Sequence, residues 1–336
     1  MKNLFTKALA TFAFGVAFAA QGYAQTKELV VAAYGGAYTD ALKKSVATFE
    51  AENNVKVKFI PASGADGIAK AKAREVDVVH ADPAWAARGE ALGLFEKLDS
   101  KLVPNLENVY ARAKLSEYSV ATNFGQYGIA YDPDALKQPP TSWYDLLDPR
   151  YKGRVTTAGF DDANVELLVL FAKLNGGDED HIDVGFQKMA QLGANVSVFY
   201  SQHPQLLDLF RSGDVVMARW LRGRVDWARQ KGVNLAFAVP KEGAIALVST
   251  VHVVKGRQNI PLAEKFVNFL LGKENQVHYA RDLGYTPARK DLDPQSMPTS
   301  IPYGEDVIAN LRLADWKKIT PKLDVWKERW NKEVVH

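Results

Sequence analysis

Apolar, strand-like runs alternate with helix-like segments over residues 28–92, and this order constrains the fold more than any other feature. Residues 28–34 are mostly apolar and precede two glycines, which predicts a buried strand and a turn. Residues 38–52 carry apolar side chains at helical spacing, and residues 55–59 alternate apolar side chains with lysines. A helix over 68–74, a strand over 76–80 and a helix over 85–92 follow. This order predicts an α/β fold with a mostly parallel sheet covered by helices.

The pattern changes in the middle of the chain and then resumes. Residues 123–131 are expected to form a Gly-punctuated strand that crosses into a second lobe, where strands and helices alternate again. Residues 248–254 are expected to return the chain to the first lobe. We therefore predict that lobe 1 comprises residues 25–128 and 250–292, and that lobe 2 comprises residues 129–249 and 293–336.

The N-terminus has the pattern of a secretory signal peptide. Lys2 and Lys7 are basic, residues 8–20 are apolar, and Gly22 and Ala24 place small residues before a cut at Gln25. The apolar stretch is shorter than the roughly 20 residues that span a bilayer. We predict that residues 1–24 are a signal peptide cleaved after Ala24, and that the mature protein is periplasmic.

Composition and missing motifs exclude several classes of function. The chain has no cysteine, so Cys-based metal sites and nucleophiles are excluded and the core must hold the fold. Its 42 Lys and Arg residues nearly balance 39 Asp and Glu residues and are interspersed with them, which argues against nucleic-acid binding. No His-Glu-x-x-His, Gly-x-Ser-x-Gly or P-loop motif occurs. We expect no enzyme activity and no cofactor or metal, and a secreted hydrolase remains a less favoured alternative.

Several segments, in their order and spacing, resemble the spermidine/putrescine-binding group of bacterial extracellular solute-binding proteins. They are residues 29–59, 77–82, 141–153, 240–243, 263–271 and 284–287. The resemblance implies a type II periplasmic binding fold: two lobes, two hinge strands and a ligand cleft that closes by hinge motion. It also implies a monomer that captures a small polar, amine-type solute and delivers it to an ABC permease in the inner membrane.

The resemblance also implies which residues contact the ligand. In this group, carboxylates hold ammonium groups and aromatic rings enclose the carbon chain, as charge-assisted hydrogen bonds and cation–π contacts favour. The matching positions here include Gly36, Tyr38, Asp82, Asp162 and Tyr285. Asp82 alternatively caps the next helix with Pro83 at its first position, and Asp162 or its neighbour Asp161 alternatively caps another.

The strand over residues 217–222 leaves two registers open. Either Trp220 and Arg222 or Arg219 and Leu221 face the cleft, because side chains alternate along a strand. We select Trp220 and Arg222 as candidate contacts.

Ser249 is a further candidate, and it stands where the resemblance implies an amine-binding aspartate. The resemblance therefore does not by itself identify a polyamine as the ligand of this chain. The arginines at 219, 222 and 224 either form a solvated strand end or clamp a carboxylate or phosphonate, which gives an alternative ligand class.

Overall fold

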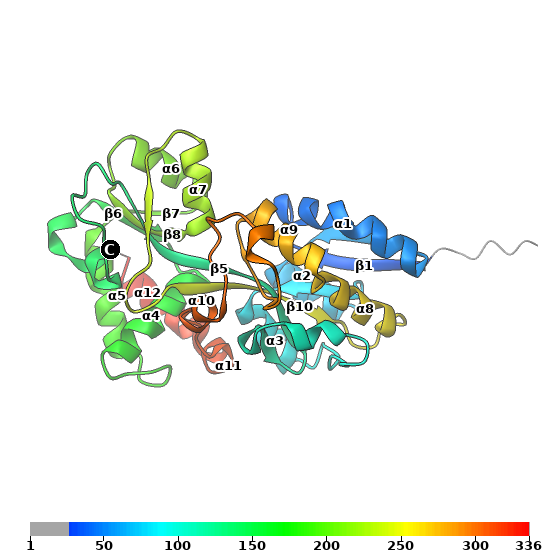
Figure 1. Cartoon of the computed structure of the whole chain (residues 1–336). Coiled ribbons are helices and arrows are strands. Elements are labelled where there is room, and N and C mark those ends of the chain that lie inside the picture. Colours follow the sequence, from blue (N-terminus) through cyan, green and yellow to red (C-terminus); the bar gives the residue numbers. More distant parts are fainter. Residues whose placement is uncertain (1–26, 336) are drawn as a thin grey trace, which may run out of the picture.

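The computed structural model describes residues 27–335, so the predicted signal peptide and its cleavage site lie outside the described residues. The chain forms two α/β lobes, and two long strands, β5 (Ser119–Tyr131) and β10 (Ile245–Val253), run between them (Figure 1). One continuous sheet passes through both lobes in the order β2-β1-β3-β10-β5-β8-β6-β7. Because β5 and β10 are neighbours at its centre, they form the paired hinge strands expected from the sequence.

Lobe 1 contains the predicted β-α-β-α-β unit. Its strands β1 (Lys27–Ala33), β2 (Val55–Pro61) and β3 (Val78–Ala81) are parallel, and β10 pairs antiparallel with β3. The helices of this lobe are α1 (Ala37–Asn53), α2 (Gly64–Lys72), α3 (Pro83–Ala91), α8 (Ile260–Leu270) and α9 (Lys273–Leu283). Short strands β4 (Lys114–Ser116) and β11 (Thr286–Pro287) pair with β5.

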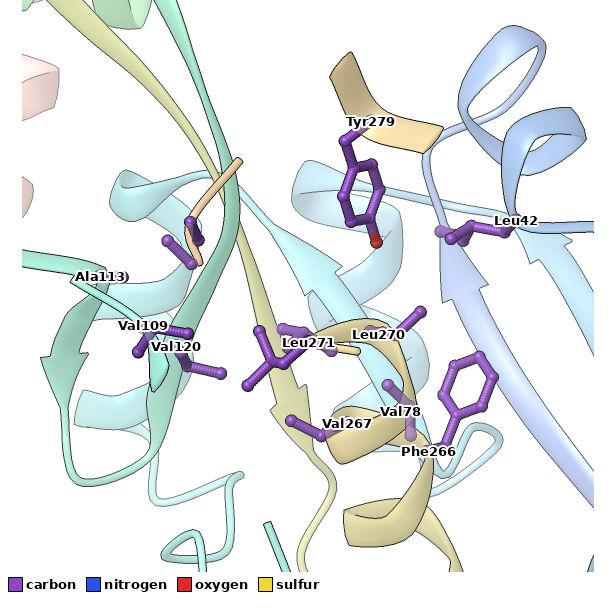
Figure 2. Packing of buried hydrophobic residues seen from close by; sticks show 14 of the residues in the cluster. Leu42, Val78, Val109, Ala113, Val120, Phe266, Val267, Leu270, Leu271 and Tyr279 are labelled. Carbon is purple, nitrogen blue, oxygen red and sulfur yellow. The ribbon is translucent and has the colours of Figure 1, made fainter. Parts of the chain in front are cut away.

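The lobe 1 core joins segments that are far apart in the sequence. Leu42 from α1, Val78 from β3, Phe266 from α8 and Tyr279 from α9 are all buried in one cluster (Figure 2). Burial of such apolar side chains contributes about 1.5–3 kcal/mol each. Because the returning helices α8 and α9 supply much of this cluster, lobe 1 is complete only after the chain has come back from lobe 2.

Lobe 2 repeats the alternation with its own core. Its strands are β6 (Val155–Ala158), β7 (Val196–Tyr200), β8 (Met217–Leu221) and β9 (Ala236–Ala238). Its helices are α4 (Asp162–Leu174), α5 (Asp183–Asn195), α6 (His203–Arg211), α7 (Arg222–Gln230) and α12 (Leu323–Glu333). Strand β6 is parallel to β7 and β8, whereas β8 pairs antiparallel with β5, which joins the lobe to the hinge.

Two of the segments on which the resemblance rests lie together in lobe 2. Ser142 and Trp143 begin a short 3-10 helix (Trp143–Leu147), and both contact the carboxylate of Glu242. The indole Nε1 of Trp143 donates to the carbonyl oxygen of Gly243 at 3.0 Å. The two segments, about 100 positions apart, therefore share a buried contact beside the start of β10.

A third segment also crosses between the lobes. The described part of the chain, residues 27–335, begins with β1 in lobe 1 and ends after α12 in lobe 2, so this part crosses an odd number of times. Residues 312–317, which we name the strap, run beside the start of β10: the Arg312 amide donates to Ala244 O, and the Ala246 amide donates to Arg312 O. The strap leads from α10 (Glu305–Ala309) to α11 (Trp316–Ile319), which packs on α3.

The bounds of the two lobes remain a prediction. Met297 and Ile301 pack against Ala280 of α9, and Ile308 and Leu311 join the lobe 1 core. These contacts favour assigning residues 293–311 to lobe 1 and only the remainder of the C-terminal segment to lobe 2. No helix within residues 27–335 has both the length and the apolarity that a membrane crossing requires.

Candidate ligand-binding cleft

Two adjoining chambers lie between the lobes, in front of the hinge strands. The outer chamber encloses about 630 Å³ and the inner chamber about 320 Å³, and both are lined by Asp82 and Leu247. Further residues of the outer chamber include Tyr34, Tyr38, Leu221, Arg224, Trp227, Ser249 and Tyr285. Further residues of the inner chamber include Tyr127, Asp161, Asp162, Glu166 and Trp316. Ligands of α/β proteins commonly bind at the carboxyl ends of parallel strands, where Tyr34 follows β1 and Asp82 follows β3.

The lobe 1 wall is held by hydrogen bonds. The hydroxyl of Tyr34 donates to Oδ1 of Asp82 at 2.8 Å, and its ring lies edge-on to that of Tyr38 with centroids 5.0 Å apart. Burial raises the pKa of Asp82, while the bond from Tyr34 opposes that rise. Asp82 occupies the N-cap position of α3 with Pro83 following, but its side chain makes no capping bond. Its carboxylate therefore faces the cleft and is open to an ammonium group.

Tyr38 lines the outer chamber with its ring, while its hydroxyl lies in a buried polar network. The hydroxyl is 3.0 Å from Oγ1 of Thr122 and 3.3 Å from Nδ1 of His80. Thr122 in turn donates to the carbonyl oxygen of Ser249 at 3.1 Å, at a point where the pairing of β5 and β10 shifts register. Tyr38 thus contributes a ring surface to the cleft and ties α1 to the hinge.

The floor of the outer chamber depends on a glycine in β5. A Cβ at Gly125 would lie 3.2 Å from Leu247, 3.3 Å from Leu221 and 3.4 Å from Tyr285. The missing side chain lets these three residues meet below the chamber. Ser249, only 3% exposed, borders the same floor from β10.

The lobe 2 wall of the outer chamber carries an arginine beside an indole. Arg224 and Trp227 lie one turn apart on α7, with the guanidinium carbon 5.9 Å from the indole centroid. Within residues 27–335, Arg224 forms no ion pair. Burial raises the pKa of Tyr285, while the charge of Arg224 lowers it and that of Asp82 raises it. Tyr285 therefore lies within the electrostatic influence of both Arg224 and Asp82.

The inner chamber is acidic. Asp161 caps α4 by accepting the Asn164 amide at 2.8 Å, which leaves Asp162 at the first helical position without a hydrogen-bond partner among residues 27–335. Burial, together with the charges of Asp82 and Asp161, raises the pKa of Asp162 from 3.8 to about 7. Glu166 accepts from Trp316 Nε1 and from the Ala314 amide, both at 2.6 Å, so it fixes the strap to lobe 2. A cationic group would relieve the mutual repulsion of these carboxylates.

Residues 44–305 match the family described as bacterial extracellular solute-binding protein. The chain belongs to this family. A relative named gamma-aminobutyric acid-binding protein, from Pseudomonas aeruginosa, is 28% identical, and the match covers 94% of this chain and 95% of the relative. The spermidine/putrescine-binding periplasmic protein of Escherichia coli is 30% identical over 60% of this chain and 62% of its own length.

The solved structures agree on the fold. An ABC transporter protein from Clostridium perfringens superimposes with a TM-score of 0.82 at 25% identity, covering 91% of this chain and 99% of that one. The predicted family and its two-lobe binding-protein fold are thereby confirmed. The family and the relatives are solute-binding proteins and not enzymes.

Five predicted contacts of this solute-binding protein meet at the cleft, and three do not. Tyr38, Asp82, Ser249 and Tyr285 line the outer chamber, and Asp162 lines the inner one. Gly36 lines neither chamber, although its neighbours Gly35 and Ala37 line the outer one. Gly36 instead adopts a φ of 62°, a left-handed conformation that glycine favours at the start of α1.

Trp220 and Arg222 lie outside both chambers, which corrects their selection from the two registers. Trp220 is fully buried in lobe 2, where its Nε1 donates to Nδ1 of His203 at 3.0 Å. Arg222 donates from Nε to Gln126 at 2.9 Å and lies over the Phe237 ring. Of the other pair, Leu221 lines the outer chamber, whereas Arg219 is fully buried and lines neither chamber.

Sequence reasoning missed four aromatic residues of the solute-binding cleft: Tyr34, Tyr127, Trp227 and Trp316. Tyr34 ends the first strand, and its position at the carboxyl end of a parallel strand was a usable signal. Trp227 follows Arg224 by three residues, a helical spacing that places both on one face of α7. Among residues 27–335, no group of three or more His, Cys, Asp or Glu side chains is arranged to hold a metal ion.

Proposed function

We propose that this protein is the substrate-binding component of an ABC importer, and that its ligand is a short zwitterion with an ammonium group at one end and a carboxylate at the other. Gamma-aminobutyric acid has this chemistry. Asp82 and Asp162 would hold the ammonium group, Arg224 would hold the carboxylate, and the rings of Tyr34, Tyr38, Trp227 and Tyr285 would enclose the carbon chain.

The observation that carries this proposal is the opposite charge of the two ends of one continuous cleft. The inner chamber presents the carboxylates of Asp162 and Asp82, whereas the outer chamber presents Arg224, which forms no ion pair among residues 27–335. Two other acids of the outer chamber are already paired, Asp226 with Arg229 and Asp282 with Lys44. Carboxylates bind ammonium groups through charge-assisted hydrogen bonds, and a guanidinium binds a carboxylate in a bidentate fork. Ser249 stands where an acid would offer a further amine contact on the floor of the outer chamber.

The relatives support an amino acid ahead of a polyamine. The relative named for gamma-aminobutyric acid aligns over 94% of this chain, whereas the spermidine/putrescine-binding and putrescine-binding relatives from Escherichia coli align over 60% and 74%. A linear polyamine is the second candidate, because the inner chamber is acidic. A ligand with carboxylate or phosphonate groups alone is less favoured, because Asp82 and Asp162 would repel it.

The transport role also implies a location and a cycle. We propose that the chain is exported to the periplasm with cleavage after Ala24, and that it works there as a monomer without nucleic-acid partners. Ligand binding would close the lobes about β5 and β10, and the closed form would dock on an inner-membrane permease.

Calorimetry and thermal unfolding of the secreted protein test the proposal. We expect gamma-aminobutyric acid to bind more tightly than putrescine, spermidine or succinate and to raise the melting temperature most, because a ligand that binds only the folded state stabilises it. Tightest binding of succinate would contradict the zwitterion assignment. Failure of every amine to bind would contradict the amine-binding role itself.

A further inference from the structure

Arg219 is a buried cation that contacts two residues of the inner chamber wall but does not itself line the chamber. It lies on β8, is fully buried, and does not line the chamber. Its Nη2 donates to Oδ2 of Asp161 at 2.7 Å and its Nε donates to Oγ1 of Thr157 at 3.0 Å. Its guanidinium carbon lies 4.9 Å from the centroid of the Tyr127 ring. Asp161 and Tyr127 both line the chamber, so Arg219 lies directly behind its wall.

This arginine is not explained by packing alone. Its Nη1 is buried without a partner among residues 27–335. Burial by itself would lower the pKa of Arg219, but the carboxylate of Asp161 and the neighbouring tyrosines raise it above the ordinary value, so the side chain stays charged. Arg219 is fully buried while the Asp161 side chain is 38% exposed, and removing the arginine from water offsets much of the attraction between the two charges. The position of this charge directly behind the wall points to a role in the charge of the chamber.

The charge balance of the chamber supplies that role. Asp161 is paired with Arg219, and Glu166 is occupied by two N–H donors of the strap. Asp82 and Asp162 remain, and both face the chamber. These two carboxylates, which share a raised pKa, suit one ammonium group between them.

We propose that Arg219 is a specificity-determining positioning residue: by neutralising Asp161, it limits the inner chamber to a single ammonium group and so disfavours diamines. This inference rests on the proposed amine-binding function. With Asp161 paired, the chamber has one fewer net negative charge, and a doubly charged diamine loses more attraction from this than a zwitterion with no net charge does.

Three variants test the inference through the ratio of the dissociation constant of putrescine to that of gamma-aminobutyric acid, measured by calorimetry. Arg219→Met leaves Asp161 unpaired, and we expect the ratio to fall about tenfold, the effect of one unit charge at about 10 Å and an effective dielectric constant of about 20. Asp161→Asn leaves Arg219 unpaired and should raise the ratio, while asparagine still caps α4. The double variant removes both charges, and its ratio should return to within about threefold of that of the unmodified protein.

Opposite shifts in the two single variants, cancelled in the double variant, are a signature that loss of structure does not produce. If Arg219→Met fails to fold, as judged by circular dichroism, the rise expected for Asp161→Asn still decides the matter. An unchanged ratio in Asp161→Asn, or shifts of the same direction in both single variants, would overturn the role of Arg219 while leaving amine binding intact. If the unmodified protein binds neither amine, the proposed function fails and this inference fails with it.

Discussion

The two walls of the cleft differ in how far they are organised before a ligand arrives. On the lobe 1 side, Tyr34 already bonds Asp82, and Tyr38 is tied to Thr122 and His80. On the lobe 2 side, Arg224 and Asp162 have no hydrogen-bond or ion-pair partner among the described residues. Lobe 1 therefore offers a preformed surface, whereas Arg224 and Asp162 of lobe 2 would gain partners from a ligand that bridges the cleft. Preorganisation of the lobe 1 wall lowers the entropic cost of binding a ligand. The unpaired charged groups of the lobe 2 wall then favour ligands that can pair with them.

The largest effect should come from removing the lobe 1 anchor. Asp82→Asn keeps the shape of the side chain and removes its charge, and we expect affinity for gamma-aminobutyric acid to fall about 100-fold, because charged hydrogen bonds contribute about 1.5–3 kcal/mol. Tyr34→Phe, which retains the ring and the carboxylate, is the matched control and should cost less than tenfold. Equal losses in the two variants, measured by calorimetry, would mean that the charge of Asp82 is not the anchor.

The next effect concerns the cation of lobe 2. Arg224→Gln should weaken gamma-aminobutyric acid binding about 30-fold and leave putrescine binding nearly unchanged or stronger, since only the amino acid has a carboxylate to lose a partner. Arg222→Gln is the control, because Arg222 contacts Gln126 and Phe237 outside the cleft. A larger loss in Arg222→Gln than in Arg224→Gln would reverse the assignment of the two arginines.

A smaller effect should appear as a dependence of affinity on pH. The pKa of Asp162 is about 7 in the empty cleft, and an ammonium group at this carboxylate favours its ionised form. Ligand binding should therefore release a proton below pH 7, and affinity should fall about tenfold between pH 8 and pH 6, as measured by calorimetry in buffers of different ionisation enthalpy.

The variant Asp162→Asn provides the control for that measurement. It should remove the part of the change in affinity that Asp162 causes and leave a smaller change from Glu166, whose pKa burial raises to about 8 in the same chamber. Because the folded-state pKa of Asp162 lies above its unfolded value, the ionised carboxylate destabilises the ligand-free protein as pH rises through about 7. The variant should therefore unfold at a higher temperature than the unmodified protein at pH 8, and a lower temperature would contradict the burial argument.

The smallest effect should come from the strap behind the hinge. Nζ of Lys317 lies 3.1 Å from Glu90 of α3, so this pair links the strap to lobe 1. The lysine is 64% exposed, and exposed ion pairs contribute at most about 1 kcal/mol. Lys317→Met should thus change affinity by no more than about threefold, through the balance of open and closed forms. Lys318→Met, its exposed neighbour, should have no effect, and a tenfold change in either variant would mean that the strap does more than link the lobes.

Periodicity predicted the parts of the fold in which each strand or helix has a distinct apolar pattern. The alternation of β1 to β3 with their helices and the crossing strands β5 and β10 are of this kind. Periodicity failed for β8, because Met217, Trp220 and Leu221 are all buried. Both faces of this strand are buried, so the alternation of side chains could not show which face points to the cleft. The strap has no period at all, and only its contacts with Ala244 and Glu166 reveal it.

The candidate site followed the same rule. Asp82 and Tyr285 were predictable because they follow ordered motifs, and Asp162 because it begins a helix after a strand. Arg224 was named only as one of three arginines, since nothing local separates a cleft arginine from one that stacks on Phe237. The pairing of Arg219 with Asp161 joins residues 58 positions apart, and no local pattern encodes such a contact.

The odd number of crossings has a practical consequence. Lys27 begins β1 in lobe 1, whereas Val334 is buried in the lobe 2 core. The two ends of the described chain therefore belong to different lobes (Figure 1). Fluorophores attached near residues 27 and 335 would change their separation whenever the halves rotate. Energy transfer between labels at the two ends should therefore report ligand occupancy of the cleft, and neither label would lie near the ligand.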